Sequence, residues 1–166
     1  SSDTSLNLYA FKQKKLLGYS QIHRSSRTKI GIPLVLNMYE LLPFWHTFFT
    51  VLGFDVIVSP LSMQSIYAMG TSTIPSDTAC FPAKLTHGHI AWLKQQGVDH
   101  IFYPCMSYNL DEGLGDNHYN CPIVAYYPEN IKDNMDGMDE NFFLEPFLDL
   151  SNREKLMVHL SEYMKQ

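Results

Sequence analysis

One uninterrupted apolar run, Ile30-Gly31-Ile32-Pro33-Leu34-Val35-Leu36, limits what this chain can fold into. A strand that is apolar on both faces belongs in a sheet that helices cover from both sides, which is the usual setting of a parallel sheet. Pro33 has no backbone N–H, so regular strand pairing is expected to fail in the second half of the run. The run therefore predicts a buried strand in a protein that combines strands with helices.

A helix and a second strand are expected directly after this run. Phe44, Phe48 and Leu52 recur at four-residue spacing, which is typical of one face of a helix over residues 41–52. Pro43 is suited to the first turn of this helix, and Gly53 to its end. The apolar residues 54–58 then predict a strand. A strand, a helix and a strand joined by tight connections form a βαβ unit, so the two strands should be parallel.

The rest of the chain continues the alternation of helices and strands. The expected elements are a short helix over 63–69, a helix over 82–96, a strand over 100–103, a strand over Ile123–Tyr127 and a last helix after the capping-box spacing of 151–154. The acidic passage 130–140 is interpreted as a polar loop. We therefore predict an α/β domain over residues 30–166, with an open, mostly parallel four-stranded sheet, helices on both faces and a Rossmann- or flavodoxin-like arrangement. Residues 1–29 are interpreted as a lead-in segment.

Charge and composition exclude two classes of partner. The formal net charge is -5, and the only basic cluster is formed by Lys12, Lys14 and Lys15, so the chain has no electrostatic footprint for nucleic acid. The sequence has no apolar run near the roughly 18 residues that a membrane span needs, and no secretory signal. A soluble protein located in the cytoplasm is expected.

Three cysteines are the clearest candidates for chemistry, because they are too few and too odd in number for a disulfide framework. Cys80 stands at the start of a predicted helix, where the helix dipole favours a thiolate. Cys105 follows a predicted strand after Pro104. Both positions belong to the carboxyl edge of a parallel sheet, where α/β proteins bind ligands. Cys121 precedes its predicted strand and is expected at the opposite edge, unless the loop from Met106 to Asn120 bends it back.

Four other residues are candidates for the same crevice or for structural roles. Asn37 follows the first strand, on the favoured edge of the sheet. His89 shares a helix face with apolar residues and is either a buried core histidine or a ligand. Glu129 follows the predicted fourth strand and either faces the crevice or lies on the surface. Gly88 lowers helix stability by about 1 kcal/mol relative to alanine, which suggests close approach of a backbone or a ligand.

Spacing alone leaves several functions open. No C-x2-C pair occurs, which disfavours a zinc knuckle and a thioredoxin-type redox motif. Cysteines that are distant in sequence and gathered by the fold are consistent with a metal or cluster in an α/β crevice. Buried structural thiols in a non-catalytic scaffolding domain are one alternative, since free cysteine is often buried. A flavodoxin-like carrier of a small anionic ligand is another.

Several motifs nevertheless resemble one family, in the same order along the chain. They are Lys29-Ile30-Gly31-Ile32-Pro33, Leu36-Asn37-Met38-Tyr39-Glu40, Pro43-Phe44-Trp45-His46-Thr47-Phe48-Phe49, Cys80-Phe81-Pro82-Ala83-Lys84-Leu85, His87-Gly88-His89, Ile101-Phe102-Tyr103-Pro104-Cys105, Asn120-Cys121-Pro122-Ile123-Val124 and Tyr127-Pro128-Glu129. Together they are similar to the cysteine-bearing domain of large proteins related to the 2-hydroxyacyl-CoA dehydratases and their activases. The likeness runs from about Leu8 to the end of the chain.

The resemblance implies an iron-sulfur cluster, of the 4Fe-4S type or related, with Cys80 and Cys105 as ligands. Cys121 matches a cysteine of the close relatives that the dehydratase subunits do not need. A second α/β domain would supply a further ligand, and an ATP-dependent activase module would deliver low-potential electrons for radical dehydration of an acyl-CoA. The segment is expected to be part of a longer protein and to be inactive alone.

Overall fold

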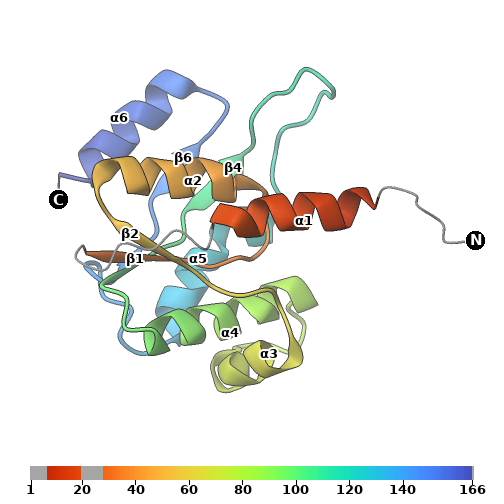
Figure 1. Ribbon diagram of the computed structural model, residues 1–166, viewed down its shortest axis with the longest axis vertical. Coiled ribbons are helices and arrows are strands. Elements are labelled where there is room, and N and C mark those ends of the chain that lie inside the picture. Colours follow the sequence, from red (N-terminus) through yellow and green to blue (C-terminus); the bar gives the residue numbers. More distant parts are fainter. Residues whose placement is uncertain (1–6, 20–27, 166) are drawn as a thin grey trace, which may run out of the picture.

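A computed structural model of the chain describes residues 7–19 and 28–165. Its centre is an open sheet of four parallel strands in the order β2-β1-β3-β5 (Figure 1). The strands are β1 (Lys29–Ile32), β2 (Asp55–Val58), β3 (His100–Phe102) and β5 (Phe143–Leu144). The α/β prediction is confirmed, and pairing of β1 ends directly before Pro33, as the missing N–H of proline requires.

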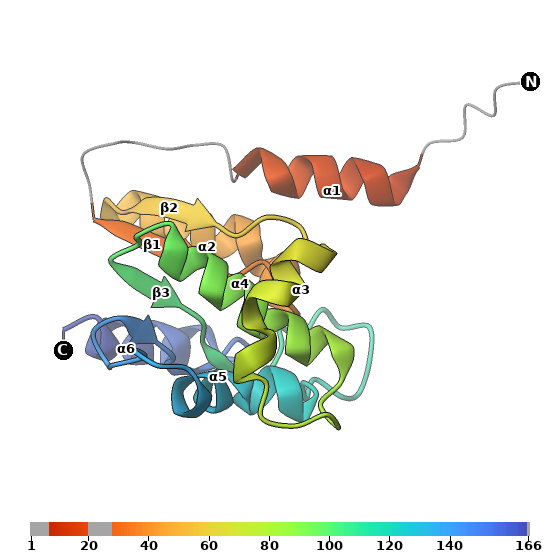
Figure 2. The ribbon, with the colours of Figure 1, turned by 90° about the horizontal axis from the view of Figure 1, so that it is seen from below.

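Helices cover both faces of the sheet (Figures 1 and 2). One face carries α2 (Met38–Leu52) and α6 (Arg153–Tyr163), and α1 (Leu8–Tyr19) packs against α2. The other face carries α3 (Gln64–Gly70), the 3-10 turn η1 (Thr71–Thr73), α4 (Phe81–Gln95) and α5 (Pro122–Asn134). None of the helices in residues 7–19 and 28–165 has the length and apolar composition of a membrane-spanning segment.

Two short strands prolong the sheet at its carboxyl edge. β4 (Cys105–Tyr108) and β6 (Phe147–Asp149) pair in parallel and continue the register of β3 with β5. The backbone N–H of Tyr103 donates to the carbonyl of Leu144, and that of Cys105 donates to the carbonyl of Pro146. The hydrogen-bond ladder therefore continues past Pro104 on one strand and Pro146 on the other. As a result, Cys105 lies within an extended strand, three residues past the end of β3.

The core is built on aromatic contacts between α2 and β3. Trp45 and Phe49 are fully buried, and their ring centroids lie 4.7 and 4.8 Å from that of Phe102. The helix ends at Gly53, whose φ of 97° is left-handed, as the sequence predicted. Full burial of one such aromatic side chain stabilises the fold by about 1.5–3 kcal/mol, so this contact fixes α2 on the sheet.

The predicted strand over Ile123–Tyr127 is wrong, because these residues form the first part of α5. Pro122 occupies the first helical position, where its missing N–H costs nothing. Tyr127 and Ile131, four residues apart, are buried together, which is the spacing of a helix face. The same helix includes the first half of the 130–140 passage, which was predicted to be a loop.

The predicted lead-in over residues 1–29 contains structure. Leu16 of α1 is buried, and the ring centroids of Tyr19 and His46 lie 5.6 Å apart. Lys12 forms an exposed ion pair of 2.5 Å with Glu40 on α2. Residues 1–6 and 20–27 of the lead-in lie outside the described residues.

Two glycines allow α3 and α4 to touch backbone to backbone. A Cβ atom on Gly88 would lie 2.0 Å from the carbonyl oxygen of Ile66, and one on Gly70 would lie 2.2 Å from the nitrogen of Gly88. Both distances are far inside van der Waals contact. The close approach that Gly88 suggested in the sequence is therefore an approach of the α3 backbone, and it places the histidines on either side of Gly88 in the interior.

Candidate functional site at the carboxyl edge of the sheet

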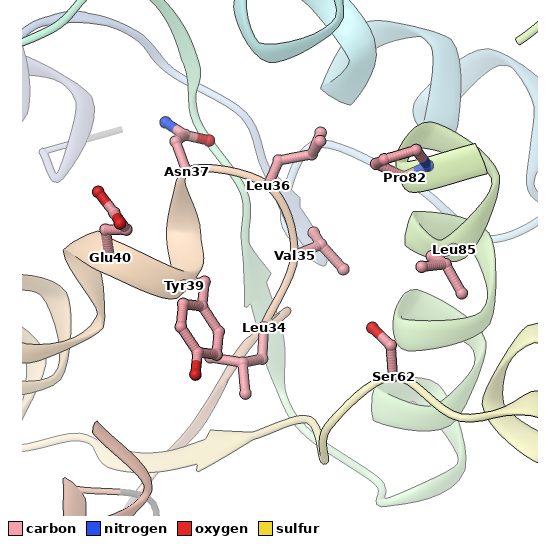
Figure 3. Close-up of a pocket in the computed structure, with 9 residues that line it drawn as sticks. All are labelled: Leu34, Val35, Leu36, Asn37, Tyr39, Glu40, Ser62, Pro82 and Leu85. Carbon is pink, nitrogen blue, oxygen red and sulfur yellow. The ribbon is translucent and has the colours of Figure 1, made fainter. Parts of the chain in front are cut away.

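A cavity of about 400 Å³ opens at the carboxyl edge of the sheet (Figure 3). The loop 34–37 that follows β1 forms one wall, Ser62 after β2 a second, and Pro82 with Leu85 of α4 a third. The connections from β1 and from β2 leave to opposite faces of the sheet at this point. Open α/β sheets bind ligands where the connections diverge in this way.

The loop after β1 has an unusual backbone. Leu36 has a φ of 46°, a left-handed conformation that is rare for a bulky residue, and Asn37 follows with the right-handed φ of -68°. Consecutive residues of opposite hand turn their N–H groups towards one side of the chain, which makes a concave site for an anion. Within the described part of the chain, the N–H groups of Leu36 and Asn37 have no acceptor.

Behind the cavity, His89 joins the two loops through serine hydroxyls. The backbone N–H of Leu34 donates to Oγ of Ser59 at 2.7 Å, and Ser59 bonds Nδ1 of His89 at 2.7 Å. Nε2 of His89 lies 3.0 Å from Oγ of Ser62, so a neutral ring can donate to one of the two serines and accept from the other. Burial lowers the pKa of His89 to about 4, so the ring is neutral. Both ring nitrogens are occupied, which favours the core role over the ligand role.

Cys80 and Cys121 occupy equivalent places at the ends of two helices. Cys80 is the N-cap of α4, Cys121 is the N-cap of α5, and both are exposed. Each helix returns antiparallel to the strands, so each begins at the carboxyl edge of the sheet. Figure 2 shows the two helices on the same side of the sheet. The prediction that Cys121 lies at the opposite edge is therefore wrong, because it rested on a strand that is a helix.

Cys105 lies beneath this edge and is fully buried. Burial raises the pKa of its thiol to about 12, and a hydrogen bond with the backbone of Glu129 opposes that shift only in part. Glu129 does not follow a strand, as was predicted, but lies within α5 with its side chain exposed. Glu129 therefore contacts Cys105 only through its backbone, and its carboxylate lies on the surface.

Met106 connects the cavity to Cys121. Nδ2 of Asn37 lies 3.7 Å from Sδ of Met106, and Nδ2 of Asn120 donates to the carbonyl oxygen of Met106 at 3.0 Å. Asn120 immediately precedes Cys121, and Met106 immediately follows Cys105. Asn37 and Asn120 therefore meet at Met106, between the chain neighbours of Cys105 and Cys121.

A second buried network, between α4 and α5, was not predicted from the sequence. His87 is fully buried, and its Nε2 lies 3.0 Å from the hydroxyl of Tyr127. Tyr127 is close enough to Cys80 for the charge of that thiolate to raise the pKa of the phenol, second to the effect of burial. The pair could have been expected only if α5 had been recognised as a helix that packs beside α4. Residues 123–127 were predicted to form a strand, so this contact was missed.

The described residues alone do not gather the donors of a full metal centre. Across residues 7–19 and 28–165, no three side chains of His, Cys, Asp or Glu gather closely enough to hold a metal ion. The thiols are the type of ligand that iron-sulfur clusters use, so the donor chemistry agrees with such a cluster, whereas the number of gathered donors does not.

The family of the chain follows from comparison with known families. Residues 29–166 match the family described as the CoA enzyme activase uncharacterised domain. The chain belongs to this family. The activase-related domain begins at the first residue of β1, so α1 precedes the matched region. No curated protein and no solved structure has a significant match to the chain.

Proposed function

We propose that this activase-related domain contributes thiol ligands to an iron-sulfur cluster that a second α/β domain completes. The observation that carries the proposal is the placement of Cys80 and Cys121 as exposed N-caps of neighbouring helices at one edge of the sheet. The positive ends of two helix dipoles favour negatively charged thiolates there. A partner domain accounts for the donors that the described residues do not gather.

The three cysteines would have different roles in such a site. Cys80 and Cys121 are accessible and would bind first. Cys105 would join as a third donor only after metal binding offsets the cost of ionising a buried thiol, since a coordinating thiol loses its proton to the metal. When bound, the cluster would supply low-potential electron transfer, in line with the resemblance to 2-hydroxyacyl-CoA dehydratases and their ATP-dependent activases. An acyl-CoA substrate and a cytoplasmic location are parts of this proposal.

Anaerobic reconstitution with iron and sulfide tests the proposal. We expect the parent protein, with its second domain, to develop the broad absorption of thiolate-to-iron charge transfer, and the present chain alone to develop little. Cys80→Ser and Cys121→Ser should each abolish most of the absorption, whereas Cys105→Ser should reduce it less. Ser62→Ala, which changes the cavity and leaves the thiols, is the matched control. Equal absorption in the parent protein with and without the two exposed thiols would contradict the proposal.

A second function, carriage of a small anionic ligand, is favoured by the loop after β1. Leu36 and Asn37, whose N–H groups have no acceptor among the described residues, line a cavity of about 400 Å³ at the N-terminus of α2. Thermal unfolding with flavin mononucleotide and with inorganic phosphate tests this function. Binding at a ligand concentration of 100 times Kd would stabilise the fold by about 2.7 kcal/mol. An unchanged Tm with both probes, together with absent cluster absorption, would leave a scaffolding domain with structural cysteines.

A further inference from the structure

A directional hydrogen-bond chain links η1, α4 and α5. Thr73 donates its only hydroxyl proton to the carbonyl of Gly70 at 2.9 Å, so it must accept from Nδ1–H of His87, 2.8 Å away. The other nitrogen of a neutral ring is then an acceptor, and the hydroxyl of Tyr127 donates to it at 3.0 Å. Burial lowers the pKa of His87 to about 4, so the ring is neutral and this arrangement is the one present near pH 7.

This hydrogen-bond chain is the main polar connection between α4 and α5, the two helices that carry the exposed thiols. Among the side chains that the structure describes, the bond from Tyr127 to His87 is the only hydrogen bond between α4 and α5. Their rings also meet edge to face, with centroids 5.7 Å apart. The rest of α5 packs mainly on β4, and α4 packs mainly on α3. The Tyr127–His87 pair is therefore the direct polar contact through which α5 and α4 are coupled.

The pair lies at a similar depth in both helices. His87 is seven residues after Cys80, and Tyr127 is six residues after Cys121. At 1.5 Å of rise per residue, these separations correspond to about 10 and about 9 Å along each axis. A shift at the pair is transmitted to both N-caps almost equally, because a helix is stiff over two turns.

His87 itself has no freedom to follow Tyr127. The backbone of α3 touches α4 at the neighbouring Gly88, where a Cβ atom would lie 2.0 Å from Ile66 O. Thr73 holds the far side of the ring. The imidazole is thus a fixed acceptor, and α5 must adjust to it.

We propose that Tyr127 and His87 are positioning residues that set the separation of the Cys80 and Cys121 thiols for a thiophilic metal or cluster. The metal-binding part of this inference rests on the proposed function, whereas the separation of the thiols does not. Tyr127→Phe removes the hydroxyl and keeps the ring, so it isolates the hydrogen bond. Tyr126→Phe is the matched control, since Tyr126 is the adjacent residue of α5, is 52 % exposed and contacts Phe147 instead.

Two measurements on the full chain test the inference. In the first, nitroxide labels on Cys80 and Cys121, in a Cys105→Ser background, report the distance distribution by pulsed electron paramagnetic resonance. We expect a narrow distribution that Tyr127→Phe broadens or shifts and Tyr126→Phe leaves unchanged. In the second, titration with Cd²⁺ followed by thiolate absorption should show about a tenfold weaker affinity for Tyr127→Phe, the fold-change that corresponds to loss of one buried hydrogen bond.

The possible results separate this inference from the proposed function. If the native chain binds Cd²⁺ and Tyr127→Phe has the same affinity and the same distance distribution, the positioning role is refuted and the metal site remains. If the distribution changes but no form of the protein binds Cd²⁺ or iron, the positioning role stands and the proposed function fails. Urea unfolding of each variant gives the fraction of protein that is unfolded under the conditions of the titration. If that fraction accounts for the whole loss of affinity, the pair only supports stability and the positioning role is refuted.

Discussion

The contact between α3 and α4 gives the sharpest prediction about stability. Gly88→Ala places a Cβ atom 2.0 Å from the carbonyl oxygen of Ile66 and 2.7 Å from its carbonyl carbon. A carbon atom normally approaches an oxygen to no less than about 3.3 Å, so α3 would have to move by more than 1 Å. Overpacking costs about 1–3 kcal/mol, and the upper end applies because backbone, rather than a flexible side chain, is in the way.

Helix propensity works in the opposite direction and makes the test decisive. Alanine is about 1 kcal/mol more favourable than glycine within a helix, so an unobstructed substitution would stabilise the protein. The net expectation for Gly88→Ala is a loss of about 2 kcal/mol, which lowers the urea midpoint by about 1 M for a slope near 2 kcal/mol/M. Gly18→Ala in α1 is the control, because no atom lies within 4 Å of its added Cβ. A urea midpoint for Gly88→Ala at or above that of the native chain would refute the close backbone contact between α3 and α4.

Two further predictions concern buried titratable groups. Burial lowers the pKa values of His87 and His89 from 6.5 to about 4, so between these values the unfolded chain binds more protons than the folded one. The free energy of unfolding should therefore fall as the pH drops from about 6.5 to about 4, by up to roughly 3 kcal/mol for each histidine. Urea midpoints at about pH 7.5 and about pH 5 measure this, and equal midpoints would contradict neutral burial. A disulfide reagent should modify Cys80 and Cys121 rapidly in the folded protein and Cys105 only on unfolding, because Cys105 is fully buried and burial raises its pKa to about 12. Three equally fast thiols would contradict the placement of Cys105.

The sequence predicted the elements whose patterns and boundaries agree. The helix expected over 82–96 is Phe81–Gln95, and the strand expected over 100–103 is His100–Phe102. Pro33 and Gly53 gave correct boundaries, since pairing of β1 stops before Pro33 and α2 ends at Gly53. Pro43, which was expected in the first turn of its helix, instead lies inside α2, because the helix begins earlier, at Met38. These signals are local, because they depend on which backbone conformations a residue allows.

The errors arose where tertiary contacts override local preference. Residues 123–127 are rich in β-branched and aromatic side chains, which favour a strand in isolation. Burial of Tyr127 and Ile131 on one helix face outweighs that preference in the fold. The short strands β4 and β6 were missed because each continues an existing strand beyond a proline, and only the partner strand reveals the register. The last helix is capped by Asn152 rather than by the Ser151 that the capping-box spacing indicated.

The missed helix also decides how the cysteines relate to each other. A strand after Cys121 would have placed that residue at the opposite edge of the sheet, away from Cys80. A helix in the same position returns the chain from the carboxyl edge, so Cys121 becomes the equivalent of Cys80 on the next helix along. The pair that the sequence favoured, Cys80 with Cys105, joins an exposed thiol to a buried one, whereas Cys80 with Cys121 joins two exposed thiols at two helix N-termini. In the proposed site, a ligand held by a second domain would reach the exposed pair first, because Cys105 is buried beneath the edge, so the fold favours an order of thiol binding in which Cys105 comes last.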